Sequence, residues 1–322
     1  MTFDPIVLFF LLGVVSGLVK SDLKIPAAIY EALSIYLLLA IGLKGGVELA
    51  KYPLLDLAGD AMIAVAAAVA IPLVGYPVLR FVGRMAQPDA ASIAAHYGSV
   101  SVVTYSVAVA AIGQQAIDHD GYMAVFLALL EFPALLLGVV LARLGDATQN
   151  GKSGLASVDW GRLLHEVLAG KSIVLLIGGL IIGYVAGRMD AYAPMAPLFR
   201  DLFKGVPALF LLEMGLVAAS RVAAFRTYGA FLVVFAVVMP VAAAAWGLVV
   251  AQWLGFTLGN AILLATLFAS ASYIAAPAAM RIAVPQANPA LSIGASLGVT
   301  FPFNVFVGIP LYVWMAQRWI GH

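Results

Sequence analysis

The 322-residue sequence contains no cysteine, only four histidines and few charged side chains. The absence of cysteine excludes disulfides, thiolate metal sites and cysteine nucleophiles. Charged residues make up 10% of the chain and hydrophobic residues 64%, whereas about a quarter of the residues in a soluble domain are charged. The composition therefore excludes an ordinary soluble enzyme. The net charge of +1 gives no reason to expect a nucleic-acid partner.

The sequence consists largely of long apolar runs. A hydrocarbon core of about 30 Å requires about 20 apolar residues of helix. We predict an all-α polytopic membrane protein, surrounded by lipid, with about ten transmembrane helices. The ten candidate spans are 5–19, 26–43, 57–82, 90–113, 121–143, 170–187, 203–219, 227–253, 258–280 and 289–317.

The basic residues predict an orientation for these spans. With the N-terminus outside, eleven of the 17 Lys and Arg residues fall in cytoplasmic loops and six fall outside. Because Lys and Arg are enriched in cytoplasmic loops, we expect an integral protein of a bacterial inner membrane with both termini outside. The polar segment 146–168 is then the main cytoplasmic linker.

Four short patterns recur in the same order in the two halves of the chain. Five spans in each half would insert the second half upside down, as in the inverted repeats of secondary transporters. We predict a first repeat at 1–145 and an inverted second repeat at 169–322. The paired patterns, at offsets of 166, 173, 171 and 169 residues, are Gly13-x-x-x-Gly17 with Gly179-x-x-x-Gly183, Ile41-Gly42-Leu43 with Met214-Gly215-Leu216, Ser99-Val100-Ser101 with Ser270-Ala271-Ser272, and Phe132-Pro133 with Phe301-Pro302.

The paired serines lie within the fourth and ninth spans. Residues two apart do not share a helix face, and Pro277 follows the second pair. These features predict that both spans are broken helices. Hydroxyl groups and free helix N-termini would together bind a small anion. The alternative is that the serines bond carbonyls of their own helices or hold neighbouring helices together.

Glu131 lies in the middle of the fifth span, two residues before Pro133. An ionisable group at that depth is a functional candidate by default, so we predict that Glu131 couples transport to a proton or holds a sodium ion, with a structural pairing as the alternative. Glu213, in the seventh span, is the second candidate acid. Thr300 and Asn304 share one face of the last span and join Ser101 in the predicted cation-coupling set, with a packing role as the alternative. No other cofactor is expected.

The residue pattern resembles the SbtA family of sodium-dependent bicarbonate transporters from one end of the chain to the other. The similarity is strongest over 270–311. The matching residues there are Ser270, Ser272, Ile274, Pro277, Arg281, Pro285, Ala287-Asn288-Pro289, Ile293-Gly294, Ser296, Gly298, Thr300, Pro302 and Ile309-Pro310-Leu311. In the first half they are Ile41-Gly42-Leu43, Gly45-Gly46, Gly98, Val100-Ser101, Thr104, Glu131 and Pro133-Ala134.

This resemblance implies a secondary transporter and not an enzyme. It implies uptake of bicarbonate with sodium or a proton, an elevator-like movement of a core domain, a homotrimer, and control by a PII-like cytoplasmic protein. Glu131 corresponds to the family's acid before Pro-Ala. Carried over by position, the anion site consists of Ser99, Ser101, Thr104, Ser270 and Ser272.

The chain departs from the family pattern at three positions. Tyr273 replaces an acid, Val102 replaces a glycine and Lys44 replaces a small hydroxyl residue. We include Tyr273 in the predicted anion site, and the choice between sodium and proton stays open. A symporter of another small organic or carboxylate anion, similar to bile-acid symporters, and a passive anion channel are the alternatives. An intramembrane enzyme would need a nucleophile–base pair or metal ligands within the spans, and the sequence has no such cluster.

Overall fold

A computed structural model describes residues 5–52, 54–131, 133–143, 161, 165, 169–221 and 225–320. The predicted linker 146–168 therefore lies almost entirely outside the described residues, as does Phe132. The first half contains α1 (Pro5–Leu18), α2 (Ala27–Leu49), α3 (Leu54–Pro77) continued by η1 (Val78–Val82), α4 (Gln87–Gly98), α5 (Val102–Gln114), α6 (Met123–Leu130) and α7 (Pro133–Arg143).

The second half has a similar series of helices. It contains α9 (Lys171–Arg188), the short turns η4 (Ala193–Met195), η5 (Pro197–Asp201) and η6 (Leu202–Lys204), α10 (Val206–Arg221), α11 (Phe225–Trp253), α12 (Leu258–Ala269) and α13 (Ala275–Ala283). The chain then continues through α14 (Pro289–Ile293), η8 (Gly294–Thr300), α15 (Phe301–Phe303), η9 (Asn304–Gly308) and α16 (Ile309–Trp319).

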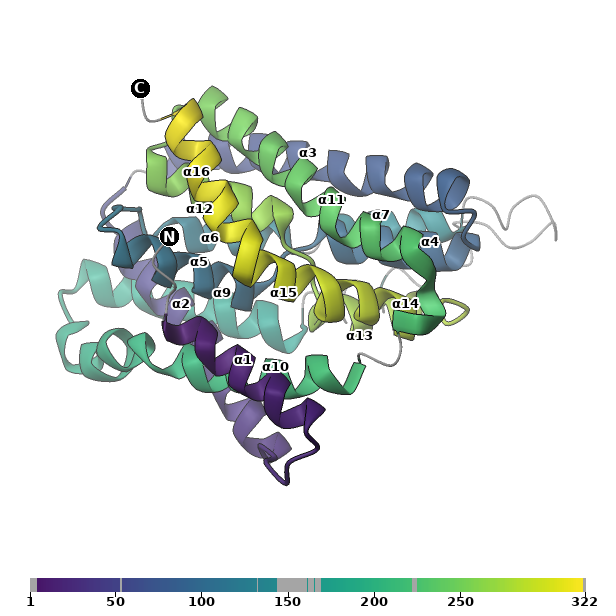
Figure 1. Cartoon of the computed structure of the whole chain (residues 1–322). Coiled ribbons are helices and arrows are strands. Elements are labelled where there is room, and N and C mark those ends of the chain that lie inside the picture. Colours follow the sequence, from purple (N-terminus) through teal and green to yellow (C-terminus); the bar gives the residue numbers. More distant parts are fainter. Residues whose placement is uncertain are drawn as a thin grey trace.

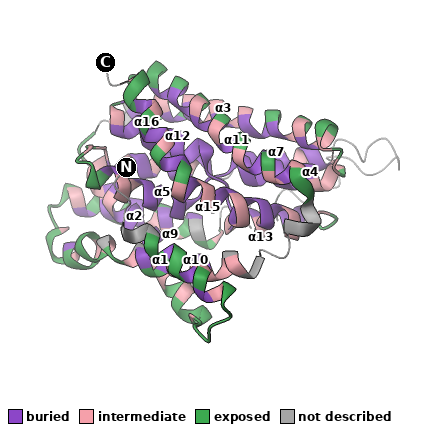
Figure 2. Ribbon diagram, viewed as in Figure 1, coloured by how far each residue is buried: buried purple, intermediate pink, exposed green. Residues whose placement is uncertain are grey.

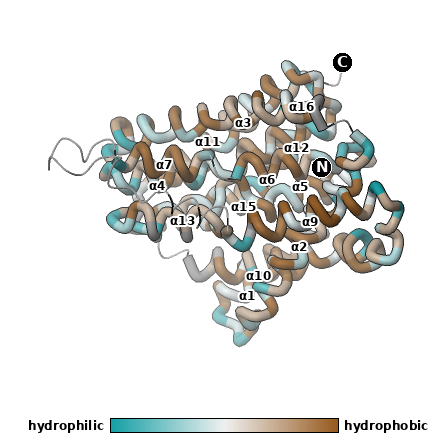
Figure 3. The backbone as a smooth tube through the Cα atoms, turned by 180° about the vertical axis from the view of Figure 1, so that it is seen from behind, coloured by the Kyte–Doolittle hydropathy of each residue, from teal (hydrophilic) through white to brown (hydrophobic). Residues whose placement is uncertain are grey.

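The outer surface of the helices is apolar along their lengths. Leu12 on α1, Val74 on α3, Ile181 on α9 and Val234 on α11 are all more than half exposed. Figure 3 shows hydrophilic residues gathered mainly at the two ends of the helices. Within the described residues, six stretches are long and apolar enough to cross a membrane, and four apolar helices are shorter. The prediction of an all-α polytopic membrane protein is confirmed.

Glycines bring four helices into close contact in two pairs. Gly13 of α1 packs against Gly215 of α10, and Gly42 of α2 packs against Gly179 of α9. A Cβ atom at Gly13 would lie 2.1 Å from the carbonyl oxygen of Leu212. Small residues allow this approach between backbones in a membrane. Figure 1 shows α1 lying beside α10. These four helices, α1, α2, α9 and α10, are called the four-helix group below.

The remaining helices surround α4 and α12. Every residue from Gly259 to Ala269 of α12 and from Ala90 to Gly98 of α4 is buried, so both stretches lie in the interior of the protein. Figure 2 shows this burial for α12. α12 packs against α11, and α4 packs against α7 and α3. Apolar residues on all sides are what a helix in such a position requires.

Both predicted helix breaks are present. α4 ends at Gly98 and α5 begins at Val102, with Ser99 extended at φ −94° and ψ 165°. α12 ends at Ala269 and α13 begins at Ala275, with Ser270 extended at φ −79° and ψ 162°. Pro277 lies in the first turn of α13, where its missing N–H group has no helical partner to lose. The second break therefore lies before this proline.

The glycine contacts of the four-helix group give a direct stability test. A Cβ atom at Gly183 would lie 2.2 Å from the carbonyl oxygen of Leu43, so Gly183→Ala must separate α9 from α2. We expect a loss of about 1–3 kcal/mol, as is typical of overpacking, measured as a lower thermal-unfolding midpoint in detergent. Gly178→Ala is the matched control, because a Cβ atom there meets nothing within 4 Å. Equal effects of the two changes would contradict this packing.

Candidate functional site

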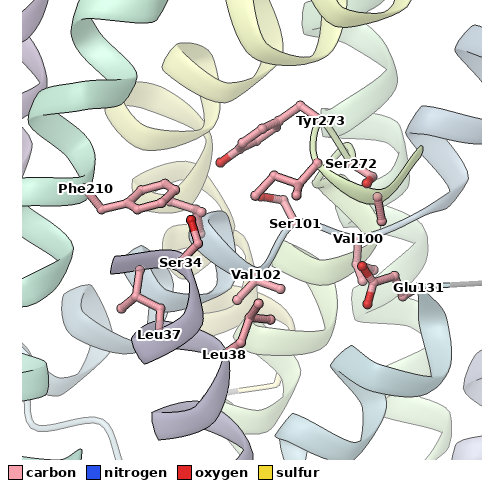
Figure 4. Close-up of a pocket in the computed structure, with 13 residues that line it drawn as sticks. Ser34, Leu37, Leu38, Val100, Ser101, Val102, Glu131, Phe210, Ser272 and Tyr273 are labelled. Atoms are coloured by element: carbon pink, nitrogen blue, oxygen red, sulfur yellow. The ribbon is translucent and has the colours of Figure 1, made fainter. Parts of the chain in front are cut away.

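A pocket lies where the two helix breaks meet the four-helix group (Figure 4). The part of its space that the centre of a water molecule can reach is about 20 Å³. The first break contributes Val100, Ser101, Val102 and Val103, the second contributes Ser272, Tyr273, Ile274 and Ala275, and Glu131 completes that side. The four-helix group contributes Ser34, Leu37 and Leu38 from α2 and Phe210 from α10.

The two breaks are joined directly by hydrogen bonds. The backbone N–H of Ser101 donates to Oγ of Ser270 at 2.9 Å. The backbone N–H of Ser272 donates to the carbonyl oxygen of His96 at 2.8 Å. Lipid cannot satisfy backbone groups that a broken helix frees, so each break supplies partners for the other. This arrangement holds the two extended segments side by side.

Serine hydroxyls accept hydrogen bonds from the first turns of both half-helices that begin at the pocket. Oγ of Ser101 accepts a hydrogen bond from the backbone N–H of Thr104 at 3.2 Å. Oγ of Ser272 accepts one from the N–H of Ala276, also at 3.2 Å. The N-termini of α5 and α13 therefore both face the pocket. Each helix N-terminus carries a partial positive charge and unpaired N–H groups, which together favour an anion.

Glu131 faces the same pocket. It is 2% exposed, and its Oε2 atom has no hydrogen-bond partner among the described residues. The backbone of Glu131 is held by Ser99, whose Oγ donates to the Glu131 carbonyl oxygen at 2.6 Å. A buried, unpaired carboxylate is costly, so this position favours a bound cation or a proton. No group of three acidic or histidine side chains that could together hold a metal ion occurs in the described part of the chain.

Tyr273 occupies the opposite part of the pocket. Its hydroxyl is buried and makes no hydrogen bond that meets normal distance and angle limits, and Figure 4 shows it directed into the pocket. Its ring packs edge-on against Phe301 with 5.4 Å between ring centres. Tyr273 therefore presents a free hydroxyl, and no second carboxylate, to a ligand in the pocket.

The other predicted site residues support the pocket or lie elsewhere. Ser99, Thr104 and Ser270 do not line it. Ser99 donates to the carbonyl of Glu131, the N–H of Thr104 donates to Ser101, and Ser270 accepts from the N–H of Ser101. Thr300 donates to the carbonyl of Ala236 at 2.7 Å and accepts from the hydroxyl of Tyr97 at 2.6 Å. Thr300 does not line the pocket. Its hydrogen bonds join η8 to α11 and to α4.

Asn304 also lies outside the pocket. Its amide N–H donates to the carbonyl of Ala269 at 2.9 Å, and its oxygen accepts from Tyr312 at 2.7 Å. Of the four predicted cation-coupling residues, the fold thus brings only Glu131 and Ser101 into one pocket. Glu213 on α10 is also absent from the lining of this pocket.

Sequence reasoning missed the wall of the pocket that the four-helix group supplies. Ser34 and Phe210 come from helices far from either break in the sequence. Ser34 lies on α2, eight positions before Gly42, and its hydroxyl donates to the carbonyl of Tyr30 at 2.9 Å. Nothing in the local sequence marks either residue, because their place in the pocket depends on how α2 and α10 pack.

The family comparison covers almost the entire chain. A family model described as the Na⁺-dependent bicarbonate transporter superfamily matches residues 5–317. The chain belongs to this superfamily. No curated protein sequence gives a significant match. Because the superfamily consists of transporters, the protein is not an enzyme, and the family resemblance read from the sequence is confirmed.

The cap on α5 gives the second prediction. Ser101→Ala removes the acceptor for the Thr104 N–H and should destabilise the protein by about 1 kcal/mol, the usual cost of losing an N-cap. The measurement is again the thermal midpoint in detergent. Ser106→Ala is the control, since its hydroxyl donates only to the carbonyl of Val102 within α5, and such bonds add little to helix stability. A Ser101→Ala protein as stable as the control would argue against the cap.

Proposed function

We propose that the protein is a secondary active transporter that moves bicarbonate together with a cation. The first candidate for this cation is sodium, and Glu131 would hold it. The observation that carries this proposal is a buried, unpaired carboxyl group in the same pocket as two helix N-termini. Membership of the superfamily supports the substrate and the ion.

Charge explains why the two ligands would bind together. An ionised Glu131 would repel an anion in the same small pocket, and this repulsion is strong where water is scarce. A sodium ion or a proton at Glu131 removes the repulsion. The helix ends of α5 and α13 then hold the anion together with Ser101, Ser272 and the Tyr273 hydroxyl. Bicarbonate binding thus depends on cation binding, and this dependence is the basis of coupled transport.

The place of the pocket supports alternating access. The pocket lies between the helix breaks and the four-helix group. We propose that the helices around α4 and α12 carry the ligands past the four-helix group in an elevator-like movement.

The proposal includes ten spans arranged as two inverted repeats, at 1–145 and 169–322. The six long and four shorter apolar helices support this number. The glycine contacts support the repeat: the offsets of 166 and 173 residues convert the Gly13–Gly215 contact into the Gly179–Gly42 contact. An inner-membrane location with both termini outside follows from the basic residues, and a trimer and a PII-like partner follow from the resemblance alone.

Two alternatives remain as outcomes of experiment. Another small organic or carboxylate anion could take the place of bicarbonate, and a competition panel against labelled bicarbonate separates these substrates. A passive channel would not accumulate its substrate. The superfamily favours neither alternative.

The coupling ion is a separate question. Tyr273 stands in place of an acid, so proton coupling is the alternative to sodium coupling. Proteoliposomes in which sodium and pH gradients are varied independently decide between the two ions.

Glu131→Gln tests the coupling role. The amide keeps the size of the side chain, but it has no negative charge to balance a sodium ion and takes up no proton at physiological pH. We expect gradient-driven uptake of labelled bicarbonate to fall more than about tenfold, because the loss of even 1.4 kcal/mol of cation binding has that effect. The matched control is Glu213→Gln, another acid of a spanning helix with an unpaired Oε2 but outside the pocket lining. Cation-dependent uptake that survives in Glu131→Gln would exclude this role.

A further inference from the structure

A second pocket lies along the same two helices as the first. α2 contributes Leu37 and Leu38 to the first pocket and Lys44 to the second, about 10 Å further along the helix at 1.5 Å per residue. α5 likewise contributes Val102 to the first and Tyr105 to the second. The two pockets are therefore successive spaces along one interface between α2 and α5.

Lys44 is the charged side chain that lines the second pocket. It is half-buried in a membrane-spanning helix, and among the described residues it forms no ion pair or hydrogen bond through its ammonium group. An ionisable group within a span is a functional candidate. An unpaired ammonium group there favours an anion that comes from outside the protein.

The acids whose charges act on Lys44 or His119 are already engaged or exposed. Glu48 accepts two hydrogen bonds from Lys51, at 2.8 and 2.9 Å. Asp120 accepts from the hydroxyl of Tyr52 at 2.5 Å and from the amide of Asn260 at 2.7 Å, and the first of these bonds raises the pKa of Tyr52 to about 12. Asp118 is exposed. Lys44 thus has no ion-pair partner within 4.0 Å among the described residues, and the charge of Glu48 acts on it only from a greater distance.

His119 reaches the same pocket from the loop between α5 and α6. The loop lies close to α2 because Gly121 packs on Glu48, where a Cβ atom would lie 2.3 Å from Cγ of that residue. Burial, and next the charge of Lys44, lower the pKa of His119 to about 4. At pH 7 its imidazole is therefore neutral and offers one N–H donor and one nitrogen acceptor.

We propose that Lys44 and His119 form a second binding site for a small, singly protonated oxyanion on the route to the Glu131 pocket. The ammonium group of Lys44 pairs with the anionic oxygen, and the neutral imidazole of His119 accepts a hydrogen bond from the ligand hydroxyl. Bicarbonate has both an anionic oxygen and a hydroxyl. The inference rests on the proposed function and adds a second binding site to it. A single ammonium group binds one oxyanion weakly enough to release it to the next pocket.

The test is the kinetics of labelled bicarbonate uptake by the full chain in proteoliposomes. Lys44→Gln should raise KM about tenfold and change kcat less than about twofold, because it weakens capture and leaves the Glu131 pocket intact. Lys44→Arg keeps the charge and should stay within about threefold of the unmodified protein. Raising ionic strength should weaken the apparent affinity of the unmodified protein and have less effect on Lys44→Gln.

Two further variants complete the test. Arg318→Gln is the matched control, since Arg318 stacks on Trp314 at 5.0 Å in α16, away from the pocket; its KM should be unchanged. His119→Phe removes the hydrogen-bond acceptor and should raise KM independently of Lys44, so the inference remains testable if one variant folds poorly. An unchanged KM in both Lys44→Gln and His119→Phe overturns the second site. Absence of bicarbonate uptake by the unmodified protein would instead overturn the proposed function.

Discussion

The structure depends on the hydrogen bonds that two broken helices make to each other inside an apolar protein. A helix break in a membrane frees backbone groups that lipid cannot bond. Here the freed N–H groups of Ser101 and Ser272 each find an acceptor beside the other break. These partners lie inside the protein, and this requirement explains why α4 is buried from Ala90 to Gly98 and α12 from Gly259 to Ala269. The helices around them supply the surface that faces lipid.

The same constraint produces the site. Ending α4 and α12 at the centre makes α5 and α13 begin there, so two partial positive charges converge on one small space. Glu131 adds a carboxyl group whose Oε2 has no partner in the described fold. Attraction for an anion and for a cation is thereby combined in one pocket, which neither feature would achieve alone. The second pocket, with Lys44, extends this electrostatic pattern along α2.

Much of this could be predicted from residues alone because the signals were local or periodic. The apolar runs indicated helices in a membrane. The serine pairs with Gly98 and Pro277 indicated the two breaks, and the depth of Glu131 in its span indicated a functional acid. The predicted grouping of Thr300 and Asn304 with Glu131 relied on a shared helix face, which does not tell what that face contacts. In the fold their side chains bond Ala236, Tyr97, Ala269 and Tyr312.

The sequence by itself determined the class of protein, the position of the breaks and the family, because hydrophobicity, helix propensity and motif order are properties of the chain read in order. Only the tertiary structure decided which groups share a space. Ser34 and Phe210 in the pocket wall, the free hydroxyl of Tyr273 and the meeting of Lys44 with His119 all arise from packing between helices distant in sequence. Such contacts depend on backbone separation and side-chain direction, which close glycine contacts such as Gly42–Gly179 set.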